Sequence, residues 1–74
     1  MPITPEDLKN RFDYHKPPND EVALRHETVR EACYKAARAI VIDTPASREQ
    51  SLALTKLEEA MMWANAAIAR NPKS

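Results

Sequence analysis

The chain contains no glycine, and this absence limits its fold more than any other feature of the 74-residue sequence. Glycine supplies the positive φ angles of tight β-hairpin turns, so a meander of short strands is disfavoured. Its absence also excludes the glycine-rich phosphate loops of nucleotide-hydrolysing enzymes and the dinucleotide fingerprint. Twelve alanines and six prolines favour helices that are interrupted by helix-ending residues. The sequence therefore predicts an all-α fold.

Capping and breaking signals divide the chain into three expected helices, at residues 4–12, 20–42 and 47–70. The first and third begin with a hydroxyl residue, followed three positions later by a side chain that can complete a capping box. The second follows a loop with two adjacent prolines and ends at Thr44-Pro45, because a residue before proline avoids the helical conformation. We expect the short first helix to precede a long antiparallel hairpin of the other two.

Apolar and small residues recur on the two longer helices in steps of three and four, the spacing of a helix-packing seam. On the second helix the seam is Val22, His26, Val29, Cys33, Ala36 and Ile40. On the third helix it is Leu54, Leu57, Met61, Ala64 and Ile68, with a separate line of small residues at Ala53, Ala60 and Ala67. Leu52, Met62 and Trp63 lie off the seam. A lone hairpin leaves this wide apolar arc exposed, which predicts further protein partners.

The chain is short enough that self-association is its expected means of stabilisation. A single domain over residues 1–74 gains only about 3–5 kcal/mol from one core. The one cysteine, Cys33, cannot form a disulfide within the chain, and the two histidines lack ligands at metal-binding spacing. We therefore expect a homo-oligomer, with no metal site and no cofactor.

Charge and hydropathy limit the expected partners and location. Eleven basic and eleven acidic residues balance, whereas proteins that bind DNA or RNA usually carry a basic excess, so neither is expected as a partner. No apolar run approaches the roughly 20 residues that span a membrane, and no secretory signal pattern is present. A lone thiol fits a reducing compartment, which predicts a cytoplasmic location.

A few aromatic and basic residues are candidates for contact with a small anionic ligand. Tyr14 can stack on a base or, together with Phe12, pin the first helix to the hairpin. Arg30 lies one turn after the residues nearest the Tyr14 loop and can hold a phosphate bidentately, although most cations on this helix are expected to be solvated. Trp63 and Arg70 share a face of the third helix. Trp63 suits a core or an interface, whereas Arg70 can complement the helix dipole or face a shared pocket.

No arrangement of residues predicts catalysis. Glu58 and Glu59 are adjacent, so on a helix their side chains diverge by about 100° and cannot form an acid–base pair. His26 falls on the apolar seam, where a packed and hydrogen-bonded histidine is expected. We expect a non-enzymatic protein.

Two stretches of the chain resemble a known family. The N-terminal Arg11-Phe12-Asp13-Tyr14-His15, followed by two prolines, and the run from Ser47 to Ala60 that continues from Trp63 to Asn71 are similar to the phage anti-CBASS cyclic-oligonucleotide sponges. Those sponges share their hairpin domain with a Thoeris anti-defence sponge. The resemblance covers about residues 7–71. It implies a homohexamer that sequesters the cyclic dinucleotides and cyclic trinucleotides of bacterial immunity without cleaving them, in the cytoplasm of the infected host, so that CBASS effectors stay inactive.

The resemblance also implies site residues. Family pockets for cyclic dinucleotides use a tyrosine from the N-terminal motif and a basic residue on the next helix, which match Tyr14 and Arg30. Phe12 and His15, from the same motif, are assigned to this pocket. An arginine of the family's cyclic trinucleotide pocket matches Arg70.

The chain departs from the family in the loop between these residues. The family loop usually carries a glycine and a lysine after the prolines, whereas here Lys16 precedes them and Asn19 follows, which leaves the register onto Arg30 open by one residue. Two other functions also stay open. One is a sponge for a cyclic ADP-ribose isomer, and the other is a helical adaptor oligomer without a nucleotide ligand.

Overall fold

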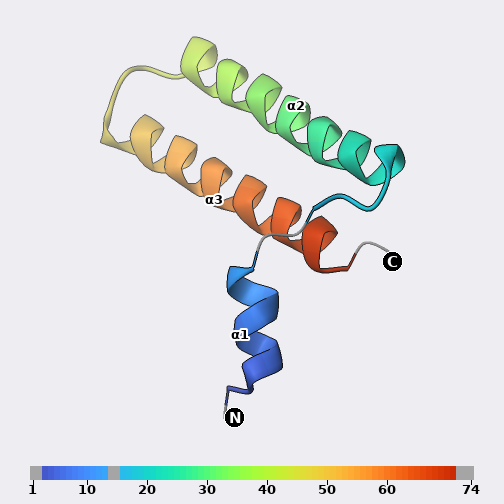
Figure 1. Cartoon of the computed structure of the whole chain (residues 1–74). Coiled ribbons are helices and arrows are strands. Elements are labelled where there is room, and N and C mark those ends of the chain that lie inside the picture. The colour runs from blue at the N-terminus through green and yellow to red at the C-terminus, as the bar shows by residue number, and fades with distance from the viewer. Residues whose placement is uncertain (1–2, 14–15, 72–74) are drawn as a thin grey trace.

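The computed structural model describes residues 3–13 and 16–71. Over these residues the chain forms three helices, α1 (Pro5–Phe12), α2 (Asp20–Asp43) and α3 (Arg48–Arg70), and no strand (Figure 1). The expected all-α fold with a helical hairpin is thus confirmed. Each helix begins and ends within one residue of its expected bound.

Side-chain caps account for where the helices begin. Before α1, Thr4 Oγ1 accepts a hydrogen bond from the backbone N–H of Asp7 (3.1 Å), and the Asp7 carboxylate accepts one from the backbone N–H of Thr4 (3.0 Å). These two hydrogen bonds, the backbone one first, lower the pKa of Asp7 below its ordinary value. Asn19 and Ser47 cap α2 and α3 in the same way with their side-chain oxygens. Because a cap residue stands just outside its helix, α1 and α3 begin one residue later than expected.

The turn between α2 and α3 is held by one glutamine. Four residues, Thr44 to Ser47, join the two helices. The side-chain amide of Gln50 donates to the backbone carbonyl of Val41 (3.4 Å) and to that of Thr44 (3.1 Å), and it lies 3.2 Å from the Thr44 hydroxyl oxygen. Its backbone N–H donates to Ser47. One residue in the first turn of α3 therefore satisfies carbonyls at the end of α2, which have no partner within that helix.

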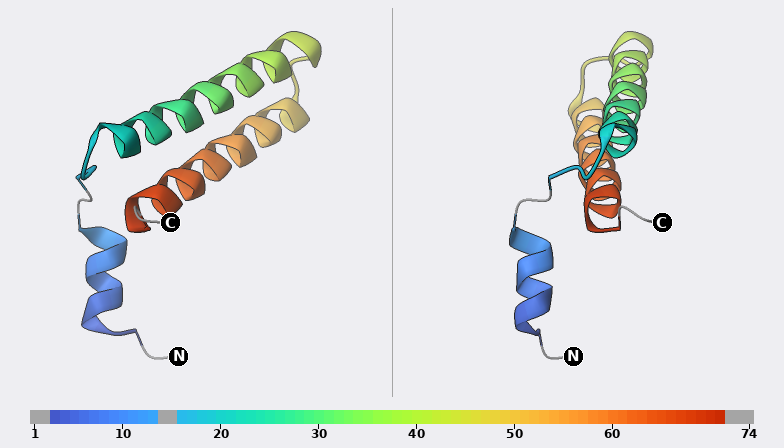
Figure 2. Two further views of the ribbon diagram at one scale, coloured as in Figure 1. Left: turned by 90° about the vertical axis from the view of Figure 1, so that its right-hand side faces the viewer. Right: turned by 45° about the vertical axis from the view of Figure 1, so that its right-hand side comes forward.

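α2 and α3 run antiparallel and side by side along their whole length (Figures 1 and 2). All five expected seam residues of α3 are half-buried. On α2, Val22 is buried, and four of the other five expected seam residues are half-buried. The exception is Ala36, which is exposed, while its neighbour Ala37 is half-buried. The expectation for Ala36 was wrong because strict steps of three and four drift around a helix of 3.6 residues per turn.

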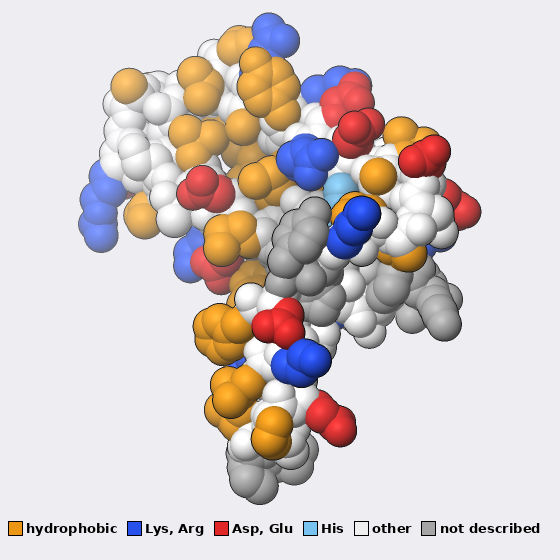
Figure 3. All heavy atoms as spheres, viewed as in Figure 1, with side chains coloured by type: hydrophobic (Ala, Val, Ile, Leu, Met, Phe, Trp, Pro, Cys, Tyr) orange, Lys and Arg blue, Asp and Glu red, His pale blue; other side chains and the backbone are white. Residues whose placement is uncertain are grey.

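The described part of the chain buries little of its apolar surface. Val22, at 4 % exposure, is its one buried hydrophobic residue. The chain exposes 6271 Å², whereas a compact monomer of this mass exposes about 4600 Å². Its radius of gyration is 15.5 Å, against about 11 Å for a compact domain of this length. Hydrophobic side chains accordingly cover much of the visible hairpin face and one edge of α1 (Figure 3).

α1 projects away from the hairpin, and both views of Figure 2 show it standing clear of α2 and α3. Its apolar side chains are exposed, with Phe12 at 79 % and Leu8 at 50 %, and Ile3, just before the helix, is 58 % exposed. Phe12 therefore does not pin α1 to the hairpin of its own chain, which corrects that interpretation. None of the described helices is long and apolar enough to cross a membrane.

Candidate functional site

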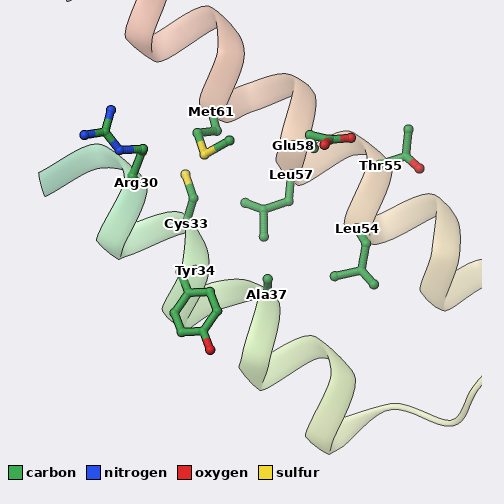
Figure 4. A pocket seen from close by; sticks show the side chains of 9 residues that line it. All are labelled: Arg30, Cys33, Tyr34, Ala37, Leu54, Thr55, Leu57, Glu58 and Met61. Atoms are coloured by element: carbon green, nitrogen blue, oxygen red, sulfur yellow. The ribbon is translucent and has the colours of Figure 1, made fainter. Parts of the chain in front are cut away.

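Arg30 lies on a shallow cleft that follows the hairpin seam. The cleft has a volume of about 370 Å³, within the range of small-molecule sites. Its lining comes from both long helices and comprises Arg30, Cys33, Tyr34, Ala37, Leu54, Thr55, Leu57, Glu58 and Met61 (Figure 4). The middle of the cleft is apolar, because Cys33, Ala37 and Leu57 belong to the half-buried seam. The polar groups lie around this apolar floor.

Tyr34 is a candidate that sequence reasoning missed. It is 65 % exposed and lines the cleft one helical turn after Arg30 on α2 (Figure 4). The sequence carried a signal for it, since an arginine and a tyrosine spaced by four residues share a helix face. That signal was missed because Tyr34 follows Cys33 directly and so falls just off the apolar seam.

The cations of α2 fall into two groups. Arg25 forms an ion pair with Glu21 (3.0 Å), and Lys35 forms one with Glu31 (3.1 Å). Arg30 and Arg38, in contrast, have no carboxylate within 4.0 Å among the residues that the structure describes, and of these two it is Arg30 that lines the cleft. Its guanidinium is exposed at one end of the cleft. It therefore has the open donor fork that a phosphate requires.

Of the other residues expected to bind a cyclic dinucleotide, only Phe12 is described by the structure, and it does not line this cleft. Phe12 is the last residue of α1, which projects away from the hairpin. Tyr14 and His15 lie outside the described residues. Within a single chain, the structure thus brings Arg30 together with Tyr34 and does not bring it together with Phe12.

Arg70 lies at the other expected site, at the C-terminal end of α3. It is half-buried, whereas Trp63, seven residues before it, is 63 % exposed and so is not a core residue. Met61 lines the Arg30 cleft, and Arg70 follows it nine positions later on α3, about 13 Å along the axis. Arg70 and Arg30 therefore occupy separate regions of the hairpin.

His26 is engaged in holding the two helices together. Its Nδ1 lies 2.9 Å from Oδ1 of Asn65 on α3, and both residues are half-buried. An amide oxygen only accepts, so the ring carries a proton on Nδ1 and donates it. This is the packed, hydrogen-bonded histidine that the sequence predicted. No group of three or more metal-binding side chains occurs in residues 3–13 and 16–71.

The architecture defines a class of protein, an all-helical hairpin whose seam is open to solvent along one side. Comparison with known proteins then identifies the family. The family model described as "Acb2/Tad1, hairpin domain" matches residues 4–69, and the chain belongs to that family. Membership implies an anti-defence sponge that binds cyclic nucleotide messengers, as the sequence resemblance indicated. A search of curated proteins and a search of solved structures returned no match.

Proposed function

We propose that this protein is a non-enzymatic sponge that binds and sequesters the cyclic oligonucleotides of CBASS immunity in the cytoplasm of an infected bacterium. The observation that supports it most directly is Arg30, an exposed guanidinium without a described carboxylate partner beside an apolar cleft, in a chain of the Acb2/Tad1 hairpin family. DNA and RNA are not proposed as ligands, because basic and acidic residues balance.

The proposed sponge is a homo-oligomer, and we favour a hexamer because the sequence resembles hexameric sponges. The exposed surface supports assembly, since it exceeds that of a compact monomer by about 1700 Å². A two-fold interface presents each residue twice. One tyrosine and one arginine per chain then match the two bases and two phosphates of a cyclic dinucleotide.

The interaction energies allow this arrangement. Two stacked bases contribute about 1–3 kcal/mol each, and two charge-assisted hydrogen bonds contribute about 1.5–3 kcal/mol each. Together they give roughly 5–12 kcal/mol before association costs, whereas nanomolar binding needs about 12 kcal/mol. Tyr14 and Arg30, with Phe12 and His15 nearby in sequence, are therefore proposed as the anchors of a site that needs further contacts.

Arg70 is proposed for a second kind of site. A cyclic trinucleotide has three phosphates, so a three-fold axis suits it as a two-fold axis suits a dinucleotide. Arg70 is half-buried at the end of α3, about 13 Å along the axis from Met61, which lines the Arg30 cleft. Separate locations allow both ligands to bind at once.

The test is calorimetric titration of the full-length protein with cyclic di-GMP and cyclic tri-AMP. We expect Arg30→Ala to weaken cyclic di-GMP binding at least about tenfold, because each site loses charge-assisted hydrogen bonds. Tyr14→Ala should also weaken it about tenfold, through the lost stack. Arg70→Ala should weaken only the trinucleotide. Chromatography of the released ligand should recover it uncleaved.

The matched control is Lys35→Ala, which removes a cation from the same helix. Because Lys35 is already paired with Glu31, its loss should leave affinity within about twofold. Unchanged affinity in both Arg30→Ala and Tyr14→Ala would rule out this site. The absence of heat with every cyclic nucleotide would favour the helical adaptor oligomer, whose exposed apolar side chains suit protein partners.

A sponge for a cyclic ADP-ribose isomer is the second candidate function. The family model favours it, because its description joins Acb2 with Tad1 in a single hairpin domain. Competition between that isomer and cyclic di-GMP on the unmodified protein separates the candidates. Under the function proposed first, an excess of the isomer leaves bound cyclic di-GMP in place.

A further inference from the structure

The cleft beside Arg30 carries two polar side chains that the proposed function does not use. Tyr34 is on its α2 side, and Glu58 is on its α3 side (Figure 4). Thr55 adds a hydroxyl one turn of helix before Glu58, and Arg30 lies at one end. An aromatic ring and a carboxylate thus line the same cleft from opposite helices.

Neither side chain has a role in holding the fold together. Tyr34 is 65 % exposed, and Glu58 is exposed as well. Within the described part of the chain, neither forms a hydrogen bond or an ion pair. The adjacent Glu59, by comparison, lies 3.8 Å from Lys56. Of these two neighbours, the carboxylate without an ion pair is the one that lines the cleft.

The carboxylate determines which part of a nucleotide this cleft can accept. An ionised Glu58 accepts hydrogen bonds and repels phosphate. A guanine offers two parallel donors on its Watson–Crick edge, the N1–H and the 2-amino group, which a carboxylate can accept together. An adenine presents an unprotonated N1 at the same position, which also accepts and therefore opposes a carboxylate. The cleft thus suits the base edge of guanine and disfavours adenine.

We infer that this cleft is a guanine-recognising subsite for the cyclic nucleotide. One face of the base stacks on Tyr34, opposite the face that the proposed function gives to Tyr14, and the edge of the base donates to Glu58 across the cleft. Arg30, one turn from Tyr34, holds the phosphate at the end of the cleft, away from the carboxylate. The inference rests on the proposed function. It adds a preference for guanine to the proposed cyclic dinucleotide site of Tyr14 and Arg30.

The experiment compares cyclic di-GMP with cyclic di-AMP by calorimetry on the full-length protein and on Glu58→Gln. Wild type should bind cyclic di-GMP more tightly. In Glu58→Gln the affinity for cyclic di-GMP should fall about tenfold, because a glutamine amide accepts only one of the two guanine donors. The affinity for cyclic di-AMP should not fall, because the amide N–H can donate to adenine N1.

Tyr34 is tested by two substitutions. Tyr34→Ala should weaken both ligands about tenfold through the lost stack, whereas Tyr34→Phe should bind as wild type does. Glu59→Gln is the matched control for Glu58→Gln, because it makes the same chemical change one position outside the cleft. It should leave both affinities unchanged.

The outcomes separate this subsite from the sponge itself. If wild type binds cyclic di-GMP but Glu58→Gln leaves the ratio of the two affinities unchanged, the subsite is overturned and the sponge stands. If wild type binds no cyclic nucleotide, both fail. If light scattering shows that Tyr34→Ala changes the mass of the assembly, a second copy of the chain covers the cleft, and the subsite is overturned.

Discussion

α1 and the α2–α3 hairpin are built with the same local devices but have different surroundings. Thr4 caps α1 as Ser47 caps α3, each through a hydroxyl that accepts a backbone N–H three residues on. The hairpin helices pack on each other along a seam, whereas α1 leaves Phe12 79 % exposed. The comparison shows that capping fixes where a helix begins, while only packing fixes where it lies.

The largest expected loss of stability is at the hairpin seam. Leu57 is half-buried on the floor of the cleft, so Leu57→Ala should lower the free energy of unfolding by about 2 kcal/mol, the low end for leucine truncation. Urea titration at one fixed protein concentration measures it. Leu52→Ala is the control, because Leu52 lies off the seam and is 48 % exposed, and it should cost less than about 0.5 kcal/mol. Equal losses would show that another chain covers the outer face.

A matched pair of cap substitutions tests whether α1 is energetically separate. Ser47→Ala should lower the free energy of unfolding of the hairpin by about 1 kcal/mol, because α3 loses its cap. Thr4→Ala removes the equivalent cap from α1 and should leave the hairpin's urea midpoint unchanged, while the α1 amide signals in an NMR spectrum lose their helical shifts. A shared loss of stability would mean that α1 packs on the hairpin of another chain.

The smallest expected effect is a pH dependence confined to α1. The folded pKa of Asp7 is lowered, mainly by the hydrogen bond from the Thr4 backbone, so the carboxylate stabilises the helix above its ordinary pKa near 4. That contribution is lost as the pH falls through the lower folded pKa. NMR titration should therefore show the Thr4 amide shifting below pH 4, while Asp7→Asn abolishes the shift. A Thr4 amide that does not move would exclude the capping box in solution.

Sequence reasoning located the helices well because their ends are chemically marked. Cap residues and prolines fixed each bound to within one residue, and periodicity found the seam except for the exchange of Ala36 and Ala37. It did not place α1 relative to the hairpin, because the spacing of Ile3, Leu8 and Phe12 does not identify the surface against which they pack. It also missed the Tyr34 cleft, since periodicity finds residues that face a partner helix, and Tyr34 lies beside that line.

The hydrogen bonds of Gln50 at the hairpin turn also bear on how fast the hairpin folds. They join residues no more than nine positions apart, so little loop-closure entropy opposes their formation. Helical hairpins with such local contacts have low contact order and fold in microseconds to milliseconds. For the homo-oligomer proposed above, each chain can then complete its hairpin before it meets another copy, and the rate of assembly depends on protein concentration rather than on folding.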